Sequence, residues 1–377
     1  MRSSPPAPTP PATPTIRLRS PGEIVSAVPY LLGFAPQASL VLIGLHGKRM
    51  VLTCRADLED VDVDPCAEAI EGALTRASAE RALLVAYASD RDVGARALAV
   101  MTERLAGAGI TVPEQISVVG DRWFGEDCAD ERCCPSEGVP VADHDEAPST
   151  MDFHAHSGGY RPDRAALVAE CHPDRPLLVA GIRSEIGILV GTDRDIAEDD
   201  IVLALRAVLG WGGPGDPTPA QLALAAVAVA DPLVRDACYA VVAPGMLGDY
   251  VPDLVEVHVP LRAAGTAAGD LDGIGVLLDG DARDRVLRRL LAWVRNLPDD
   301  VPGAAMPALV VAAAAHWCAG DGARARILVE RAHALDAAPL PMLETLSSAI
   351  AHGFRPPGYD RLSTERPGDG LSGRFIA

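Results

Sequence analysis

The sequence predicts an N-terminal α/β domain with a mixed, mostly parallel sheet, followed by an all-α C-terminal domain. Up to about residue 145, apolar strand-like runs alternate with amphipathic helical segments, which is typical of crossover connections between parallel strands. From about residue 160 onward only helical patterns follow, separated by Pro/Gly-rich breaks. At 377 residues the chain is also long enough for about two domains.

The first domain is expected to open with a helix over residues 20–34. Ser20 is a good N-cap, Pro21 suits the first helical position and Gly33 can end the helix. The run 39–58 predicts two strands joined by a His-Gly turn. The elements expected next are a helix at 64–78, a strand at 81–89, a helix at 92–109 and a strand at 114–120.

The second domain consists of segments with helical spacing. Helices are expected at 161–171, 198–210, 218–242, 281–297, 304–320, 322–335 and 341–353. The segment 175–191 fits either a strand or a helix. The stretch 304–336 resembles one tetratricopeptide unit, but such units stack in arrays of about three. An ordinary helical hairpin is therefore the simpler interpretation.

These patterns give the expected domain boundaries. The α/β domain spans residues 16–145, a linker spans 146–160, and the helical domain spans 161–355. Pro-rich residues 1–15 and Gly/Pro/Arg-rich residues 356–377 have the composition of disordered tails.

Charge and hydropathy limit the partners and the compartment. A net charge of −19 argues against nucleic acid, whose phosphates need a basic patch, and against anionic membrane surfaces. The first 14 residues contain no apolar signal segment, and the longest apolar run, 304–320, is too short to span a bilayer. We therefore expect a cytoplasmic protein whose eight cysteines are reduced.

Three blocks of the sequence resemble one known family. The run 18–45 with residues 54–58 resembles the opening of the actinobacterial family described as domain of unknown function 4192. Residues 121–141 and 317–336 are similar to its middle and final blocks. The resemblance implies an actinobacterial origin, which agrees with the use of arginine and a single lysine, Lys48. It implies no activity.

The most reactive stretch is "GEDCADERCCPSEGVPV", residues 125–141. Cys128, Cys133 and Cys134 have the spacing C-x4-C-C, whereas zinc usually takes four ligands from two knuckles. The second knuckle is missing, and the side chains of adjacent cysteines are expected to diverge. We therefore expect a structural loop. The alternatives are a zinc site, with His144 as a candidate fourth ligand, and a redox-active pair of thiols.

A second motif, "DFHAH" at residues 152–156, has the D-x-H-x-H spacing of some metal-binding strands. An acidic segment precedes it and helices follow, so the apolar strand and barrel that such a motif requires are missing. No zinc deaminase, nucleophile-elbow, Walker or dinucleotide-binding motif occurs in the sequence.

The carboxyl ends of the predicted strands carry polar and aromatic side chains. In open α/β sheets, ligands bind beyond these ends, so we expect a small polar ligand there. The candidate residues are Arg55, Asp57, Tyr87, Asp90, Asp121, Arg122 and Trp123. The structural alternative is that Arg55 and Asp57 form an ion pair and that Asp90 caps a helix.

These observations favour a non-catalytic protein without a cofactor that binds a small ligand or a protein partner. The alternative is a zinc-dependent hydrolase or thiol redox enzyme that uses the cysteines at 128–134. A third hypothesis is a scaffold that docks a peptide on its helical hairpin. The sequence does not identify the ligand or the partner.

Overall fold

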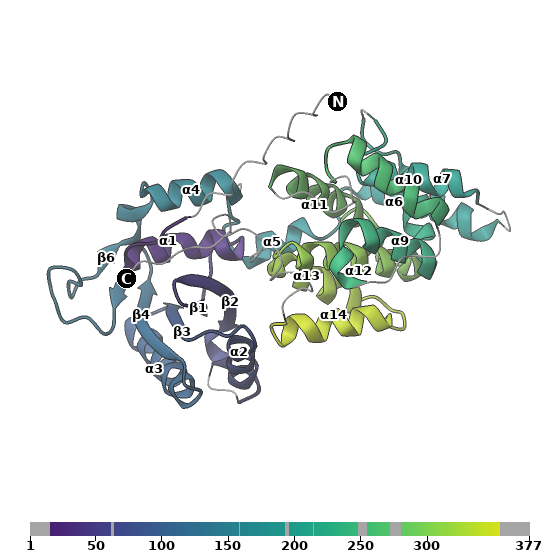
Figure 1. The fold of residues 1–377 in the computed structure, drawn as a ribbon. Coiled ribbons are helices and arrows are strands. Elements are labelled where there is room, and N and C mark those ends of the chain that lie inside the picture. Colours follow the sequence, from purple (N-terminus) through teal and green to yellow (C-terminus); the bar gives the residue numbers. More distant parts are fainter. Residues whose placement is uncertain are drawn as a thin grey trace, which may run out of the picture.

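The computed structural model describes residues 16–61, 64–157, 159–192, 196–213, 215–247, 255–271 and 280–354. They form a sheet flanked by helices and, beside it, an assembly of helices (Figure 1). The expectations for residues 1–15 and 356–377 lie outside the described residues.

Six strands form one sheet in the order β2-β1-β3-β4-β5-β6. The strands are β1 (Ser39–His46), β2 (Arg49–Asp57), β3 (Arg81–Ala88), β4 (Thr111–Val119), β5 (Arg122–Gly125) and β6 (Val139–Pro140). Only β3 and β4 are parallel neighbours, and the other four pairings are antiparallel. The sheet is mixed, as predicted, but the expectation that it is mostly parallel is wrong.

Two features of the connections explain this difference. The crossover through α2 (Asp64–Arg76) carries the chain from β2 past β1, so β3 pairs with β1 in the antiparallel sense. A two-residue turn, Gly120–Asp121, then reverses the chain between β4 and β5, where Val119 pairs with Arg122. Gly120 has a φ of 60°, which hairpin turns of this length require and glycine adopts without strain.

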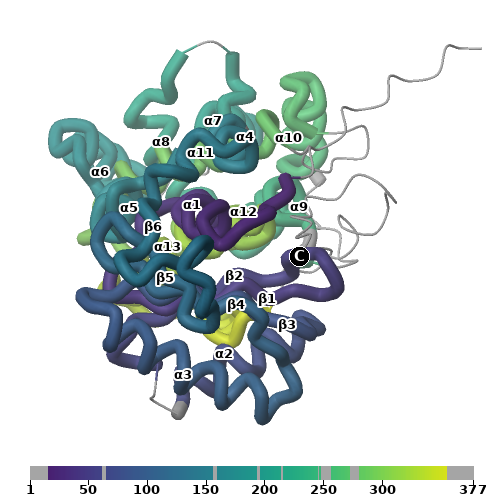
Figure 2. The backbone as a smooth tube through the Cα atoms, turned by 90° about the vertical axis from the view of Figure 1, so that its left-hand side faces the viewer, coloured from purple at the N-terminus to yellow at the C-terminus, as the bar shows by residue number. Residues whose placement is uncertain are grey.

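Helices cover both faces of the sheet. Helices α1 (Pro21–Leu32) and α4 (Pro148–Ser157) lie on one face, and α2 and α3 (Arg91–Gly107) lie on the other (Figure 1). The view in Figure 2, turned by 90°, shows the same layers. Alternation along β1 explains this arrangement, because Leu40 and Leu42 pack against α2 and α3, whereas Val41 and Ile43 pack against α1. The first half is therefore a three-layer α/β/α structure.

The range expected to be a linker, 146–160, contains helix α4. Phe153 of α4 packs on the α1 side of the core, and its ring lies 6.2 Å from that of Tyr30. The imidazole of His154 is also 6.2 Å from the Tyr30 ring. The D-x-H-x-H motif therefore lies on a helix that packs against α1, and its spacing does not place both histidines on one face of a strand.

The second half consists of helices. They are α5 (Arg164–Glu170), α6 (Pro176–Gly191), α7 (Glu198–Val208), α8 (Pro219–Ala228), α9 (Pro232–Val242), α10 (Val255–Ala267), α11 (Asp281–Val294), α12 (Pro302–Cys318), α13 (Gly322–His333) and α14 (Pro341–Ala351). Short 3-10 helices occur at η1 (Leu58–Asp60), η2 (Val141–His144) and η3 (Pro244–Met246). The segment 175–191 is thus helical, and α10 was not predicted. No helix in the described part of the chain is long and apolar enough to cross a membrane.

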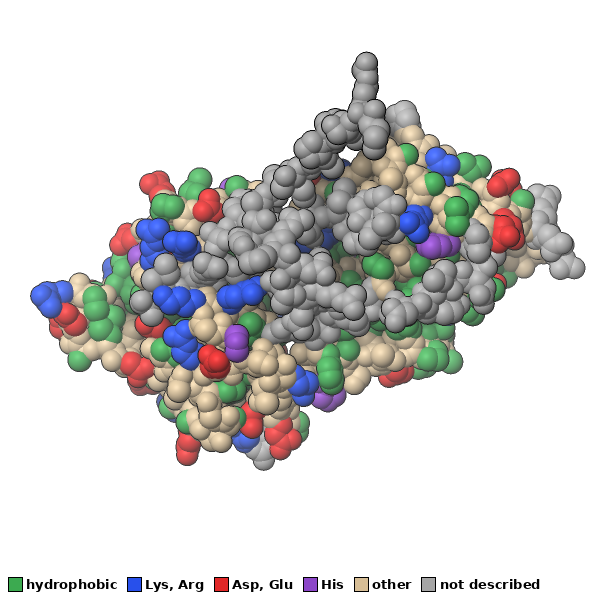
Figure 3. Space-filling model, viewed as in Figure 1, with side chains coloured by type: hydrophobic (Ala, Val, Ile, Leu, Met, Phe, Trp, Pro, Cys, Tyr) green, Lys and Arg blue, Asp and Glu red, His purple; other side chains and the backbone are tan. Residues whose placement is uncertain are grey.

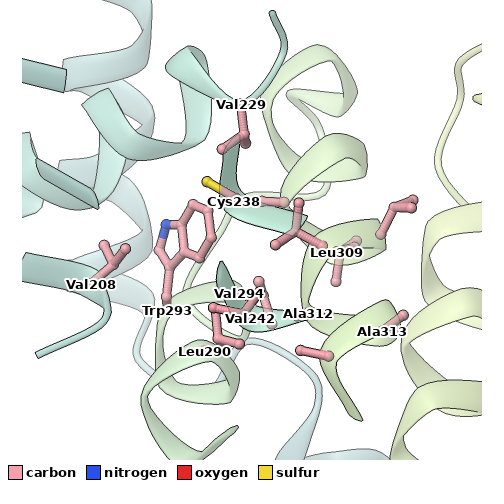
Figure 4. Packing of buried hydrophobic residues seen from close by; sticks show 14 of the residues in the cluster. Val208, Val229, Cys238, Val242, Leu290, Trp293, Val294, Leu309, Ala312 and Ala313 are labelled. Carbon is pink, nitrogen blue, oxygen red and sulfur yellow. The ribbon is translucent and has the colours of Figure 1, made fainter. Parts of the chain in front are cut away.

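The helical core contains many small side chains and three tryptophans, Trp211, Trp293 and Trp317. Every residue of α12 from Ala304 to Trp317 is buried, and its many alanines allow neighbouring helices to approach closely. Trp293 of α11 fills the space between Val208, Val229 and Cys238 (Figure 4). Its indole Nε1 donates to the carbonyl of Leu222 at 3.2 Å, so the buried polar atom is satisfied.

The two halves are joined by backbone and side-chain contacts. Arg161 N donates to Gly33 O at 2.9 Å, and Ala35 N donates to Arg161 O at 2.8 Å. Arg324 of α13 bonds to both Asp321 and Glu170, at 3.1 and 3.0 Å. Glu170 also pairs with Arg161, and Arg161 is bonded to Gly33 and Ala35 after α1. The α12–α13 turn is therefore linked to the end of α1.

Asp321 makes this junction sensitive to acid. Burial alone would raise the pKa of its carboxyl, but the hydrogen bond from His316 (2.9 Å) and the charge of Arg324 hold that pKa well below its usual range. A carboxyl with a depressed pKa stabilises the fold above its unfolded pKa of about 4, and this contribution is lost as the pH falls further.

Asp321→Asn should lower the free energy of unfolding at pH 7 by about 3 kcal/mol, because it leaves buried partners unpaired. The difference from wild type should shrink between about pH 4 and pH 2, as measured by urea unfolding across this range. The control is Asp336→Asn, at an exposed position just after α13. It should change the free energy of unfolding by less than about 0.5 kcal/mol. A pH-independent difference for Asp321→Asn would contradict this account.

Candidate functional site

The structure separates the seven residues predicted at the carboxyl ends of the strands. Arg55 and Asp57 lie on β2, and Arg122 and Trp123 lie on β5, four strand positions away. At about 4.8 Å per strand this distance is roughly 19 Å. One small ligand therefore cannot contact both groups.

The central members of this set have structural roles. Tyr87 is mostly buried, and its hydroxyl donates to the carbonyl of Val25 at 3.3 Å. Asp90 caps α3 by accepting from Val93 N at 2.9 Å. Asp121 is exposed in the β4–β5 turn. Asp90 is therefore a helix cap, which was the structural alternative to a ligand-binding role.

Of the two predicted residues on β5, one binds the cysteine loop and the other packs in the core. Arg122 Nη1 donates to the carbonyl oxygens of Glu137 and Gly138, at 3.2 and 2.6 Å. Trp123 is 4% exposed and packs with the apolar core on the α1 side. Neither residue lines the cleft that contains Arg55 and Asp57.

Arg55 and Asp57 lie in a cleft of about 820 Å³ between the two halves of the molecule. All eight residues 50–57 line this cleft. Side chains alternate between the two faces of a strand, so an uninterrupted run of lining residues means that the cleft faces the edge of β2. In Figure 1, β2 lies on the side of the sheet toward α13 and α14.

The outer edge of β2 is unpaired within the described residues, because β2 is the terminal strand of the sheet. Leu58 N donates to Ala38 O at 2.9 Å. With the β1–β2 register, this bond shows which residues of β2 direct their backbone N–H and C=O groups toward β1. In this register residues 52, 54 and 56 bond to β1. The backbone N–H and C=O groups of Thr53 and Arg55, and the N–H of Asp57, therefore point into the cleft. The C=O of Asp57 instead begins the 3-10 helix Leu58–Asp60.

Helices form the rest of the cleft. The end of α1 contributes apolar side chains to one wall and α2 contributes to another, while the α12–α13 turn and the end of α14 face β2. The apolar lining residues on these helices include Leu31, Leu32, Ile70, Ala73, Trp317, Ala323, Ile327 and Ile350. One end of the cleft is closed where Arg76 of α2 lies over the ring of Phe354, 4.7 Å from its centroid.

Five of the six charged residues that line the cleft are paired with one another. Arg55 Nη2 donates to Asp57 Oδ1 at 2.6 Å. Glu330 accepts from Arg164 at 2.6 Å and from Arg326 at 3.1 Å. Figure 3 likewise shows acidic and basic side chains close together over the sheet half. Such pairs leave a cleft with polar ends and little net charge.

The ionisable groups of the cleft are poorly suited to nucleophilic catalysis. Burial, followed by the nearby Cys66, raises the pKa of the Cys54 thiol to about 12. Burial and the charge of Asp60 also raise the pKa of Cys66. Among the described lining residues no histidine is present to act as their base.

The three loop cysteines converge. The sulfur atoms of Cys128, Cys133 and Cys134 all lie within 4.8 Å of one another, so the expectation that adjacent cysteines diverge is wrong. The reason is a turn, in which Cys133 N and Cys134 N both donate to Asp130 O, at 3.0 and 2.8 Å. His144, the predicted fourth ligand, is not part of this group.

The imidazole of His144 belongs to a different contact. It lies directly beside Gly22, where a Cβ atom would be 2.1 Å from its Cδ2 and Nε2 atoms. Its ring centroid is 6.1 Å from that of Trp123. His144 therefore packs between α1 and β5, in a space that only glycine at position 22 leaves open.

The family described as Domain of unknown function (DUF4192) matches residues 21–249, which include β2 and the cysteine loop. The chain belongs to this family. No curated protein and no solved structure matches the chain. In this DUF4192 protein the strand wall of the cleft lies inside the matched range, and α12–α14 lie outside it. The similarity expected at 317–336 is therefore not covered by the match.

The rates at which the thiols react with an alkylating agent should differ between the exposed cysteine loop and the cleft. Hydrogen bonds from the thiols of Cys133 and Cys134, and from the N–H of Asp130, lower the pKa of Cys128. In reduced, metal-depleted protein at pH 7, iodoacetamide should label Cys128 more than about tenfold faster than Cys54. Peptide mass spectrometry after timed labelling measures these rates, and preferential labelling of Cys54 or Cys66 would contradict this assignment.

Proposed function

We propose that this protein is a binding module that takes an extended polypeptide segment along β2, in the cleft between the sheet and helices α12–α14. The observation that carries the proposal is that the outer edge of β2, which has no strand partner within the described residues, lines an 820 Å³ cleft over residues 50–57. Strand addition to such an edge is a common mode of peptide recognition.

Backbone hydrogen bonding supplies the first reason. Thr53, Arg55 and Asp57 offer three N–H donors along one line, and Thr53 and Arg55 offer two C=O acceptors. Natural proteins usually protect a long edge with proline, lysine, a bulge or a covering element. The segment of β2 that lines the cleft has neither proline nor lysine. The edge is instead enclosed by helices that leave room beside it.

Side-chain chemistry supplies the second reason. Successive side chains of an added strand would point alternately toward α1 and toward α2. Both directions are lined by apolar groups, with Leu31 and Leu32 on one side and Ile70 and Ala73 on the other. The facing wall has small residues at Gly320, Gly322 and Ala323. The cleft is therefore suited to a segment with apolar side chains of moderate size.

Small-molecule binding is the alternative within the same cleft. Its volume falls in the range of small-ligand pockets, about 300–1,000 Å³, and its paired charges could orient a polar group. A partly enclosed row of backbone groups without strand partners favours a peptide, because only an extended chain repeats donors and acceptors at the spacing of a strand.

The test compares two substitutions at one position of β2. Thr53→Pro removes the outward N–H and blocks pairing, whereas Thr53→Val keeps the backbone and the side-chain shape. Peptides are first selected from a phage-displayed random dodecapeptide library on the wild-type chain. Synthetic copies should bind Thr53→Val as they bind wild type, and Thr53→Pro at least about tenfold more weakly.

Two further readouts make this experiment decisive. Circular dichroism and thermal unfolding must show that both variants fold. Two copies of a selected peptide are N-methylated, one at its odd-numbered residues and one at its even-numbered residues. Only one of the two copies should lose binding, because strand pairing uses every second N–H. Equal binding to both Thr53 variants, or no selected peptides, would overturn the proposal.

A further inference from the structure

The loop that joins β5 to β6 gathers three thiols outside the cleft. Cys128 Sγ lies 3.1 Å from Cys133 Sγ, and Cys133 Sγ lies 3.6 Å from Cys134 Sγ. Cys128 and Cys133 are exposed, and Cys134 is half-buried. The binding function proposed above does not use these groups.

The loop is built to hold the three sulfur atoms together. The β5–β6 pairing closes its base, where Arg122 bonds to the carbonyl oxygens of Glu137 and Gly138, just before β6. Within the loop, Asp130 fixes the turn before Cys133 by accepting from Arg132 N at 3.0 Å. Gly125 lies against the thiols, since a Cβ there would be 2.9 Å from Cys134 Sγ.

The composition of the loop points to a cation. Residues 126–138, EDCADERCCPSEG, include five acidic side chains and one arginine, so the local field favours positive charge. Apart from the cysteines, only Ala129 and Pro135 are apolar, and they are too few to form a core for a loop of this length. A metal ion would supply the cross-link that apolar packing does not.

We propose that Cys128, Cys133 and Cys134 bind one thiophilic metal ion of the zinc class through three sulfur ligands. A tetrahedral ion at about 2.3 Å from each sulfur places sulfur atoms about 3.8 Å apart. Cys133 and Cys134 already have a spacing of 3.6 Å. Cys128 lies 3.1 Å from Cys133, so its sulfur must move outward by less than about 1 Å to take part. Binding releases the thiol protons to solvent as each sulfur becomes a ligand. His144 packs on Gly22 and supplies no fourth ligand in this arrangement.

The test uses the full-length chain, reduced and stripped of metal with a chelator. Zn²⁺ should bind with a stoichiometry of one by elemental analysis, and three thiols should become protected from titration. Co²⁺ should give the near-ultraviolet sulfur-to-metal charge-transfer band of thiolate ligation. Cys133→Ala should weaken Zn²⁺ binding at least about 100-fold, and Cys128→Ala should have a similar effect.

Matched controls separate the site from the other thiols. Cys318→Ala removes a cysteine outside the cluster and should leave zinc affinity unchanged, and His144→Ala should do the same. Thermal unfolding of every variant shows whether it folds. No metal uptake by the reduced chain, or equal affinity of Cys133→Ala and Cys318→Ala, would overturn the proposal. Formation of a Cys128–Cys133 disulfide in place of metal uptake would also overturn it.

Discussion

A short backbone pairing between residues 33–35, which follow α1, and Arg161, which precedes α5, determines how the helical half lies against the sheet. Arg161 bonds to the backbone on both sides of Phe34, and the Phe34 ring is buried in the helical core. Arg324 then links the α12–α13 turn to Glu170 at the end of α5, and Glu170 also pairs with Arg161. These contacts hold the end of one helical hairpin opposite the edge of β2.

The open strand edge follows from this placement. The connection through α2 puts β3 next to β1, so β2 remains at the end of the sheet. Residues after α14 contact α2 and close one end of the space beside β2. Gly353 lies so close to Ala73 that a Cβ at position 353 would be 2.4 Å from the Ala73 Cβ. Backbone polar groups of β2 are thus partly enclosed but unpaired, which is unfavourable unless a partner or water satisfies them.

Local signals in the sequence predicted most elements but not their pairing. The Ser20 cap, the His-Gly hairpin and the alternating apolar runs correspond to elements of the structure. The Gly120–Asp121 pair was a readable hairpin signal that was missed, and with it the antiparallel strand β5. The cleft has no local signal, because residues 50–57 and 317–354 meet only through tertiary packing. Convergence of Cys133 and Cys134 depends on a turn at Asp130, which the spacing of the cysteines does not reveal.

The most direct test of the open edge is amide hydrogen exchange along β2 in the free protein. The account predicts alternation, in which the amides of Thr53 and Arg55 exchange at least about tenfold faster than those of Leu52 and Cys54. A selected peptide should then slow the first pair and leave the second unchanged. Uniform protection of all four amides in the free protein would mean that the edge is already paired, and would contradict the proposed mode of binding.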